Sequence, residues 1–291
     1  MDLNKIMLTI FSIPKPFCGQ AEIIQTNAIH SWTTLLSECE IILFGNEEGM
    51  DDIATKLSVT HIPRIKRNEF GTPLISDAFS KAKEIAKYKK LAYVNSDIIL
   101  MNDFTKAIEK IKEPLFLMIG QRWDAEIKEK INFNELNWAG ELCSYIKVKG
   151  KLHGPSGIDY FVFPRELEFE LPPFTVGRIG WDNWLIYYIR SLRIPIIDAT
   201  KVVTAIHQKH DYSHSPWGKK SRVEGPETQR NLKLIGDLSN MLTLRDADWI
   251  LTPNGLERPG FLRSILSGLS LFYPWRKILS IKRRLQRFYD N

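Results

Sequence analysis

Two polar side chains that could bind a metal ion, Asn95 and Asp97, interrupt an apolar stretch that runs from Tyr93 to Leu100. The apolar residues before them predict a strand that delivers both side chains to its carboxyl end. A carboxylate there, two residues after an amide oxygen, can hold a hard divalent cation beside phosphate groups. The alternative is a solvated turn in which Asp97 caps the following segment, and the triplet alone does not decide between them.

The segments around this triplet alternate between strand-like and helix-like patterns. Apolar runs predict strands over 6–11, 40–44, 59–62, 91–94 and 115–119, and helical periodicity predicts helices over 21–36, 51–57, 77–89 and 103–110. This succession predicts an α/β, Rossmann-like, mostly parallel sheet flanked by helices, with ligands at the carboxyl ends of its strands. From about residue 123 the pattern becomes mixed and rich in loops.

At Asn95-Ser96-Asp97 the chain resembles the nucleotide-sugar-dependent glycosyltransferases of the GT-A fold, which carry a D-x-D motif at this point. The likeness continues through 154–161, 180–184 and 205–207, covers about residues 5–215, and extends to loosely characterised bacterial and archaeal glycosyltransferase-like proteins. It implies a nucleoside-diphosphate sugar and a divalent cation, Mn²⁺ or Mg²⁺. The first Asp of the motif is Asn95 here, a neutral and poorer ligand. The cation therefore depends on Asp97 and a later donor, and action without metal stays open.

His207 is the natural later donor. Val202–Ile206 predicts a strand that presents His207 at its end, where GT-A enzymes often use a histidine as a further metal ligand. Imidazole beside a carboxylate tolerates Mn²⁺ more readily than Mg²⁺. A hydrogen-bonded loop histidine is an equal alternative. A separate zinc site with His210 and His214 is disfavoured, because 208–216 is turn-like rather than helical.

Asp182 precedes an apolar helix, predicted over 185–192, and lies between Trp181 and Trp184. A carboxylate there suits a base that takes the proton of an acceptor hydroxyl, with the indole of Trp181 stacked on a sugar ring. The resemblance implies an inverting reaction, since inverting GT-A enzymes place their base at a comparable helix start. The alternative is a helix cap with no catalytic role. Asp159, which enters a strand over 160–163, is the rival base.

Other candidates line the predicted site less specifically. Arg122 could neutralise a diphosphate or an acidic acceptor, Trp123 could line the sugar pocket, and Gly157 could allow a loop to pack over a ligand. A surface arginine and a tight turn are the plainer alternatives. The predicted nucleotide contacts are Thr9, Phe11, Asn46, Asp77, Asn95, Ser96 and Asp97. Of these, Asp77 serves equally well as a helix cap.

Composition describes an ordinary globular chain. The 291 residues are 44% hydrophobic and 25% charged, which excludes disordered and fibrous classes. Three cysteines without metal-ligand spacing indicate reduced thiols in the cytoplasm. No run is long and apolar enough to cross a membrane, and Asp2 and Lys5 interrupt the only candidate signal region.

Basic charge is concentrated in the last 34 residues. Residues 258–291 hold eight basic residues and one acidic, a net +7, whereas residues 1–257 hold 32 basic and 33 acidic, a net −1. A body without basic surplus argues against nucleic acid as a partner. The tail interleaves its charge with Trp, Phe and Leu, which is typical of a helix on an anionic membrane surface, broken at Pro274. A helix docked on the protein's own body and a nucleic-acid-binding tail are the alternatives.

Together these features predict a catalytic domain over 1–257, with a nucleotide-sugar half over about 1–120 and an acceptor half over about 121–257, followed by the tail at 258–291. The predicted function is metal-assisted, inverting sugar transfer to a glycan or lipid-linked hydroxyl, in the cytoplasm or on the inner face of the cell membrane. A sugar-nucleotide nucleotidyltransferase is an alternative, although Ser12–Gln20 lacks its glycine-rich phosphate loop. A non-catalytic carbohydrate-binding protein would keep the tryptophans without needing Asp97.

Overall fold

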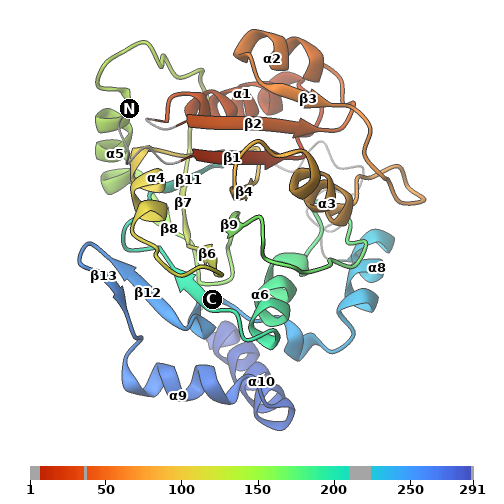
Figure 1. Cartoon of the computed structure of the whole chain (residues 1–291), viewed down its shortest axis with the longest axis vertical. Coiled ribbons are helices and arrows are strands. Elements are labelled where there is room, and N and C mark those ends of the chain that lie inside the picture. Colours follow the sequence, from red (N-terminus) through yellow and green to blue (C-terminus); the bar gives the residue numbers. More distant parts are fainter. Residues whose placement is uncertain (1–6, 36–37, 210–223, 290–291) are drawn as a thin grey trace.

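Parallel strands from the first third of the chain form one half of a nine-stranded sheet. A computed structural model describes residues 7–35, 38–209 and 224–289 (Figure 1). The first elements are β1 (Met7–Ser12), α1 (Gly19–Thr33), β2 (Glu38–Phe44), α2 (Met50–Leu57), β3 (Thr60–Ile62), α3 (Ile75–Ile85) and β4 (Lys90–Val94). β1 pairs in parallel with β2 and β4, and β2 with β3. The carboxyl ends of these strands therefore meet at one edge.

Two strands in the second half of the sheet run antiparallel to their neighbours, one at the centre of the sheet and one at its edge. The order is β13-β12-β10-β6-β9-β4-β1-β2-β3. The added strands are β6 (Leu117–Ile119), β9 (Tyr160–Pro164), β10 (Ile196–Asp198), β12 (Trp249–Thr252) and β13 (Gly255–Glu257). β9 runs antiparallel to β4 and β6, whereas β10 is parallel to β6 and β12. The predicted α/β class with a mostly parallel sheet is confirmed.

A second, four-stranded sheet carries the polar residues of interest. Its order is β5-β11-β7-β8, formed by β5 (Ile98–Ile99), β7 (Arg122–Ala125), β8 (Lys151–Leu152) and β11 (Ala205–Gln208). β11 lies antiparallel to β5 and parallel to β7. The strand predicted over 202–206 is displaced toward the C-terminus, because Val202 and Val203 donate their N–H groups to Ala199 O in a turn. His207 consequently lies within the strand and not after it.

Helices cover both faces of the large sheet, since its central strands are apolar on both sides. The remaining helices are α4 (Asn102–Glu109), α5 (Trp138–Lys149), α6 (Trp181–Ser191), α8 (Pro226–Ile235), α9 (Phe261–Leu269) and α10 (Tyr273–Tyr289), with short 3₁₀ turns η1 (Leu238–Asn240) and η2 (Leu244–Asp246). One core cluster includes Trp32 of α1 and Phe104 of α4, and the other includes Phe79 of α3 and Leu185 of α6.

The starts of helices α3 and α6 differ from those predicted from the sequence. α3 begins at Ile75 with Leu74 as its N-cap, so Asp77 lies in the first turn and does not cap the helix. Likewise Gly180 is the N-cap of α6, with a φ of 99°, and Asp182 is the second helical residue. Glycine suits that cap because a left-handed backbone costs it little.

The tail is helical, as predicted, but its break lies at residues 270–272, so the prediction that Pro274 breaks the helix is wrong. Pro274 is the second residue of α10, a position where a missing N–H leaves no helical hydrogen bond unmade. Figure 1 shows α9 and α10 at the end of the molecule opposite α2 and β3. Over the residues that the structure describes, none of the helices has the length and hydropathy that crossing a membrane requires.

Candidate active site

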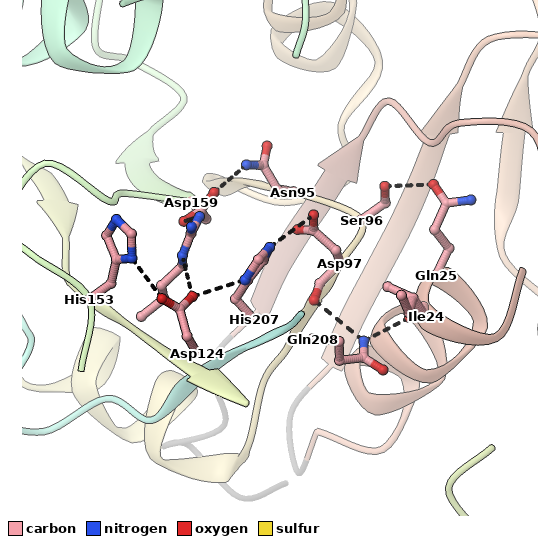
Figure 2. Close-up of polar contacts among 11 residues, drawn as sticks. Ile24, Gln25, Asn95, Ser96, Asp97, Asp124, His153, Asp159, His207 and Gln208 are labelled. Carbon is pink, nitrogen blue, oxygen red and sulfur yellow. Dashed lines mark hydrogen bonds and ion pairs between the residues drawn. The ribbon is translucent and has the colours of Figure 1, made fainter. Parts of the chain in front are cut away.

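Strand register in the small sheet brings Asp97, His207 and Asp124 into one row. His207 of β11 pairs with Ile98 of β5 on one side and with Asp124 of β7 on the other. Asp97 immediately precedes Ile98, and its Oδ2 lies 3.6 Å from Nε2 of His207. The other ring nitrogen, Nδ1, donates to Oδ1 of Asp124 at 2.9 Å. Figure 2 shows the imidazole held between the two carboxylates.

Asp124 accepts hydrogen bonds from three cationic or ionisable side chains. Besides His207, Nε of Arg122 donates to its Oδ1 at 3.0 Å and Nδ1 of His153 donates to its Oδ2 at 2.7 Å. Burial opposes ionisation of this carboxyl, but the hydrogen bonds from His207 and His153 and the charge of Arg122 outweigh it. They hold the pKa of Asp124 well below its usual range. Asp124 is therefore a permanent anion.

His207 is buried, and burial by itself would lower its pKa. The charges of Asp97 and Asp124 and their hydrogen bonds outweigh that effect and raise the pKa of His207 to about 9. Without a bound cation the imidazole is thus protonated at neutral pH. The site favours positive charge between Asp97 and Asp124, whether a proton or a metal ion supplies it.

A second carboxylate, Asp159, fixes the residues beside this row. Its Oδ2 accepts from Nη1 of Arg122 at 2.6 Å, and its Oδ1 accepts from the side-chain amide of Asn95 at 2.6 Å. The backbone N–H of Asn95 also donates to Asp159 O. Asp159 comes just before β9, the antiparallel neighbour of β4, which explains why it meets Asn95. We refer to the following residues as the Asp124 cluster: Asn95, Asp97, Arg122, Asp124, His153, Asp159 and His207.

Contacts with α1 hold the Asn95-Ser96-Asp97 turn in place. The hydroxyl of Ser96 donates to Oε1 of Gln25 at 2.9 Å, and that same oxygen accepts from Lys15 N. The side-chain amide of Gln208 donates to Ile24 O at 2.8 Å and to Asp97 O at 3.4 Å (Figure 2). The turn that bears Asp97 is thus attached to both α1 and β11.

Asp182 comes within electrostatic reach of the same region. Tyr93, two residues before Asn95, has its ring 5.4 Å from that of Trp181 at the start of α6. Burial raises the pKa of Tyr93 well above its usual value, and the charges of Asp97, Asp159 and Asp182 raise it further. Three carboxylates from three segments of the chain therefore act on one hydroxyl. The predicted bases Asp159 and Asp182 both flank the end of β4.

The donor set suits a cation that shares its coordination shell with phosphate oxygens. Among the described residues, no group of three or more His, Cys, Asp or Glu side chains could hold a metal by itself. Asp97 and His207 supply two donors 3.6 Å apart, and Figure 2 shows the side-chain oxygen of Asn95 turned away from Asp159. One or two protein ligands completed by substrate phosphates are usual for Mg²⁺ in nucleotide sites. His210 and His214 lie outside the described residues.

Several predicted nucleotide contacts are structural instead. Thr9 and Phe11 are both 0% exposed, so the prediction that they touch a ligand is wrong. The hydroxyl of Thr9 donates to Glu40, and Phe11 packs edge-on against Phe79 and Tyr93. Inward-facing residues of a strand buried on both sides cannot reach a ligand, a distinction that apolar patterning alone does not make.

Two more residues predicted to contact the nucleotide, Asp77 and Asn46, bind other residues of the chain. Asp77 is 8% exposed and accepts from Lys66 N at 2.8 Å, with Nζ of Lys81 3.0 Å away. It therefore holds the loop after β3 against α3, and the structure does not support a ribose contact. Asn46 is exposed, and its side-chain oxygen accepts from Arg67 at 2.6 Å. Its contact with the base stays a prediction.

Both tryptophans predicted to meet a sugar face the core. Trp123 alternates with Arg122 and Asp124 along β7, so it points to the opposite face, where it packs against the cluster that includes Ile146 of α5. Trp181 is 5% exposed and contacts Phe79, Tyr93 and Phe161. The prediction that Trp181 stacks on a sugar ring is therefore wrong. Trp123 is half-buried and faces away from Asp124, which gives no support to a place in the sugar pocket.

Two residues of the Asp124 cluster, His153 and Asp124, were not predicted from the sequence. Asp124 directly follows the predicted pair Arg122 and Trp123, and the period-two alternation of a strand would have paired it with Arg122. His153 lies in a loop far along the chain. The sequence offered one hint, Gly157, which was predicted to permit a close approach. The structure shows that a Cβ at this position would lie 2.1 Å from Cδ2 of His153. The close approach that Gly157 permits is thus to a histidine ring.

Comparison with solved structures gives likenesses of fold. The chain is similar to the mannosyltransferase PcManGT from Pyrobaculum calidifontis, solved with GDP-Man and Mn²⁺, at a TM-score of 0.47 and 12% identity over 74% of this chain and 60% of that one. It is similar to S. aureus TarS at 0.43 and 12%, over 70% and 58% of the two chains. This chain thus matches less than two thirds of the length of each of these two solved proteins.

A third similar structure is glucosyl-3-phosphoglycerate synthase from Mycobacterium tuberculosis, in complex with Mn²⁺, UDP and glucosyl-3-phosphoglycerate. Its TM-score is 0.44 at 10% identity, over 81% of this chain and 80% of that one. No family model matches the sequence, and no curated protein matches it. The solved structures are glycosyltransferases, the class that the sequence resembles.

Proposed function

We propose that the protein is a glycosyltransferase that moves a sugar from a nucleoside-diphosphate sugar to an acceptor hydroxyl. The observation that carries the proposal is the placement of Asp97 at the carboxyl end of β4, 3.6 Å from Nε2 of His207 and beside Arg122. A doubly wound sheet binds ligands at that edge. The paired carboxylate and imidazole suit a cation, and the guanidinium suits the negative charge of a diphosphate.

Asp97 and His207 would hold the divalent cation, with the oxygen of Asn95 as a weaker donor. Bound there, such a cation would stabilise the charge that develops on the departing diphosphate. Asp124 keeps its hydrogen bond to Nδ1 of His207, which leaves Nε2 directed toward Asp97. Arg122, held by Asp124 and Asp159, adds a fixed positive charge whose orientation costs nothing at the moment of reaction.

Asp182 is the base that we propose for the acceptor hydroxyl. Both carboxylate oxygens of Asp159 already accept hydrogen bonds, from Arg122 and from Asn95, so neither is open to an acceptor hydroxyl. Asp182 lies in the first turn of α6, and its charge raises the pKa of Tyr93, a residue of β4. In-line attack assisted by this carboxylate gives inversion at the sugar carbon.

The acceptor that we propose is a glycan or lipid-linked hydroxyl at the cytoplasmic face of a membrane. Residues 258–291 carry a net charge of +7 and form helices with exposed aromatic residues. Peripheral attachment of this tail to anionic lipid would bring the enzyme to a lipid-linked substrate. Residues 1–120 would then serve the nucleotide sugar and residues 121–257 the acceptor.

A thermal-shift titration with UDP and GDP, each with and without Mn²⁺, tests the proposal. Binding to the folded state raises the melting temperature, so the nucleoside diphosphate should stabilise the protein more when Mn²⁺ is present. Asp97→Ala should remove the Mn²⁺-dependent part of the shift and abolish transfer. Asp52→Ala, at an exposed position of α2, is the matched control and should behave as wild type. An Asp97→Ala variant with full transfer activity would refute the assignment.

A further inference from the structure

The tail helices are docked on the body through one face each. In α9, Ser267 is 3% exposed, and its hydroxyl donates to Asp246 O at 2.8 Å. Arg190 of α6, 4% exposed, donates through Nη1 to Ser267 O at 3.0 Å and to Oγ of Ser270 at 2.9 Å. These buried polar contacts fix the rotation of α9 about its axis, because a turned helix would leave them unmade.

α10 is fixed in the same way by a buried arginine. Arg276 is 8% exposed, its guanidinium lies 4.5 Å from the ring centre of Tyr187, and its Nε donates to Oγ of Ser239 at 3.3 Å. This basic residue of the tail is therefore occupied by the protein itself. The opposite faces of both helices must then point away from the body.

Those outward faces are apolar. We call the following exposed residues the tail surface, with their exposed fractions: Phe261 84%, Leu262 70%, Ile265 43%, Phe272 64%, Trp275 50% and Ile278 55%. The spacing of Phe261, Leu262 and Ile265 keeps them on one side of α9, and Trp275 and Ile278 share one side of α10. Phe272 lies in the break between the two helices. Single exposed apolar residues are common on proteins, but six of them within 18 consecutive residues, three with aromatic rings, mark an interaction site.

Charge distinguishes a membrane from a second copy of the chain as the occupant. Exposed Arg258 and Lys277 flank the tail surface, and Lys282, Arg283, Arg284 and Arg287 follow along α10 in sequence. Two tails face to face would bring net charges of +7 and +7 together, which disfavours self-association. An anionic lipid surface offers both an apolar interior and the opposite charge.

We propose that the tail surface lies flat in the interface of an anionic bilayer, with α9 and α10 parallel to the membrane plane. The inference rests on the peripheral attachment proposed above and identifies the side chains that enter the lipid. It does not depend on sugar transfer. Because the inner faces are locked, the body is held in one orientation relative to the membrane and does not hang from a loose tether.

Co-sedimentation with vesicles tests this face of the tail. The full chain is mixed with vesicles of phosphatidylcholine alone or of phosphatidylcholine with phosphatidylglycerol. Wild type should bind the anionic vesicles, and the double variant Phe272→Ser, Trp275→Ser should bind them about tenfold or more weakly. The double variant Leu136→Ser, Val148→Ser is the control, since both residues are exposed apolar side chains far from the tail in sequence, at 106% and 77%. It should bind as wild type.

Equal sedimentation of the tail-surface variant and wild type would overturn the inference. So would a wild type that is dimeric without lipid, together with a tail-surface variant that is monomeric, because the second copy would then be the occupant. Far-ultraviolet circular dichroism and an unchanged melting temperature establish that the variant is folded. The Mn²⁺-dependent shift with nucleoside diphosphate is measured on the same samples, so loss of catalytic function and loss of the membrane face are told apart.

Discussion

Two clusters of ion pairs join distant segments of this chain, and they differ in charge balance. The Asp124 cluster has three carboxylates, Asp97, Asp124 and Asp159, around Arg122 and the protonated His207. A second group links Arg178 to Glu227 of α8, and Oε1 of Glu227 also accepts from Asn68 at 2.8 Å. There one cation meets one anion and a neutral amide.

This difference in charge balance distinguishes a candidate ligand-binding site from an ion pair that only stabilises the fold. The Glu227 group is balanced, so adding a ligand to it would leave a charge unpaired. In the Asp124 cluster an imidazole sits between two carboxylates, and a metal ion can replace its proton at little electrostatic cost. Substitutions in the Asp124 cluster should therefore affect ligand binding as well as stability, whereas substitutions in the Glu227 group should affect stability alone.

Asp124→Ala is expected to give the largest effect. It leaves Arg122, His153 and His207 without their shared acceptor, and because the imidazole of His207 is buried, leaving its charge unpaired costs about 3 kcal/mol. Urea unfolding at neutral pH measures the loss. Asp124→Asn keeps the shape and is expected to lose less stability but most of the Mn²⁺-dependent shift, since His207 is no longer fixed. A variant that retains that shift would contradict the role given to Asp124.

Asn95→Asp sharpens the comparison by adding a negative charge to the cluster. The amide of Asn95 donates to Asp159 at 2.6 Å, so a carboxylate there would face another carboxylate. We expect a loss of about 1–3 kcal/mol in unfolding free energy without metal. Mn²⁺ should then stabilise this variant more than wild type, because one further anionic ligand is available. Calorimetric titration with Mn²⁺ checks the sign, and weaker binding than wild type would exclude this position from the metal site.

Glu227→Gln addresses the balanced cluster and should cost about 1 kcal/mol at neutral pH. Burial opposes ionisation of Glu227, but hydrogen bonds from Asn68 and Arg178 lower its pKa below the usual value. A lowered pKa in the folded state stabilises the protein above the ordinary value of 4.5 and loses that effect as pH falls through the folded-state pKa. The difference between variant and wild type should thus shrink in acid. Unfolding curves at pH 7 and in acid measure it, and nucleotide binding should be unchanged.

The sequence predicted the first half of the large sheet well, because its central strands are apolar and alternate with segments of helical periodicity. It did not predict β10, β12 or β13. The sequence also singled out Asp97 and His207, since both follow apolar runs, and the structure brings the two side chains together. Their binding of a metal ion stays a prediction. The sequence did not predict which residues of a strand direct their side chains toward the site. Trp123 and Asp124 are adjacent, yet only the second faces the site, and that choice is made by the pairing of β7 with β11. Pairing between strands about 80 residues apart leaves no local trace.

Thr9 and Trp181 show the opposite error. Both stand where a ligand contact is reasonable, after or within elements that lead to the site, but packing takes them into the core. Thr9 lies in β1 between β2 and β4, where its hydroxyl donates to Glu40, whereas Trp181 packs against Phe161 of β9, the strand that enters between β4 and β6. An antiparallel strand inserted between parallel neighbours comes from a long-range connection, and alternation along the first half does not indicate it.

Gly157→Ala gives the smallest expected effect and tests whether His153 belongs to the site. The added Cβ would lie 2.1 Å from Cδ2 of His153, so the ring must move away from Asp124. His153 is 38% exposed and can swing toward solvent, which limits the cost to about 1 kcal/mol. Gly154→Ala is the matched control, because nothing lies within 4 Å of a Cβ there. If His153 helps Asp124 to hold Arg122 and His207, Gly157→Ala weakens the Mn²⁺-dependent shift and Gly154→Ala does not. Equal shifts in the two variants would confine His153 to a structural role.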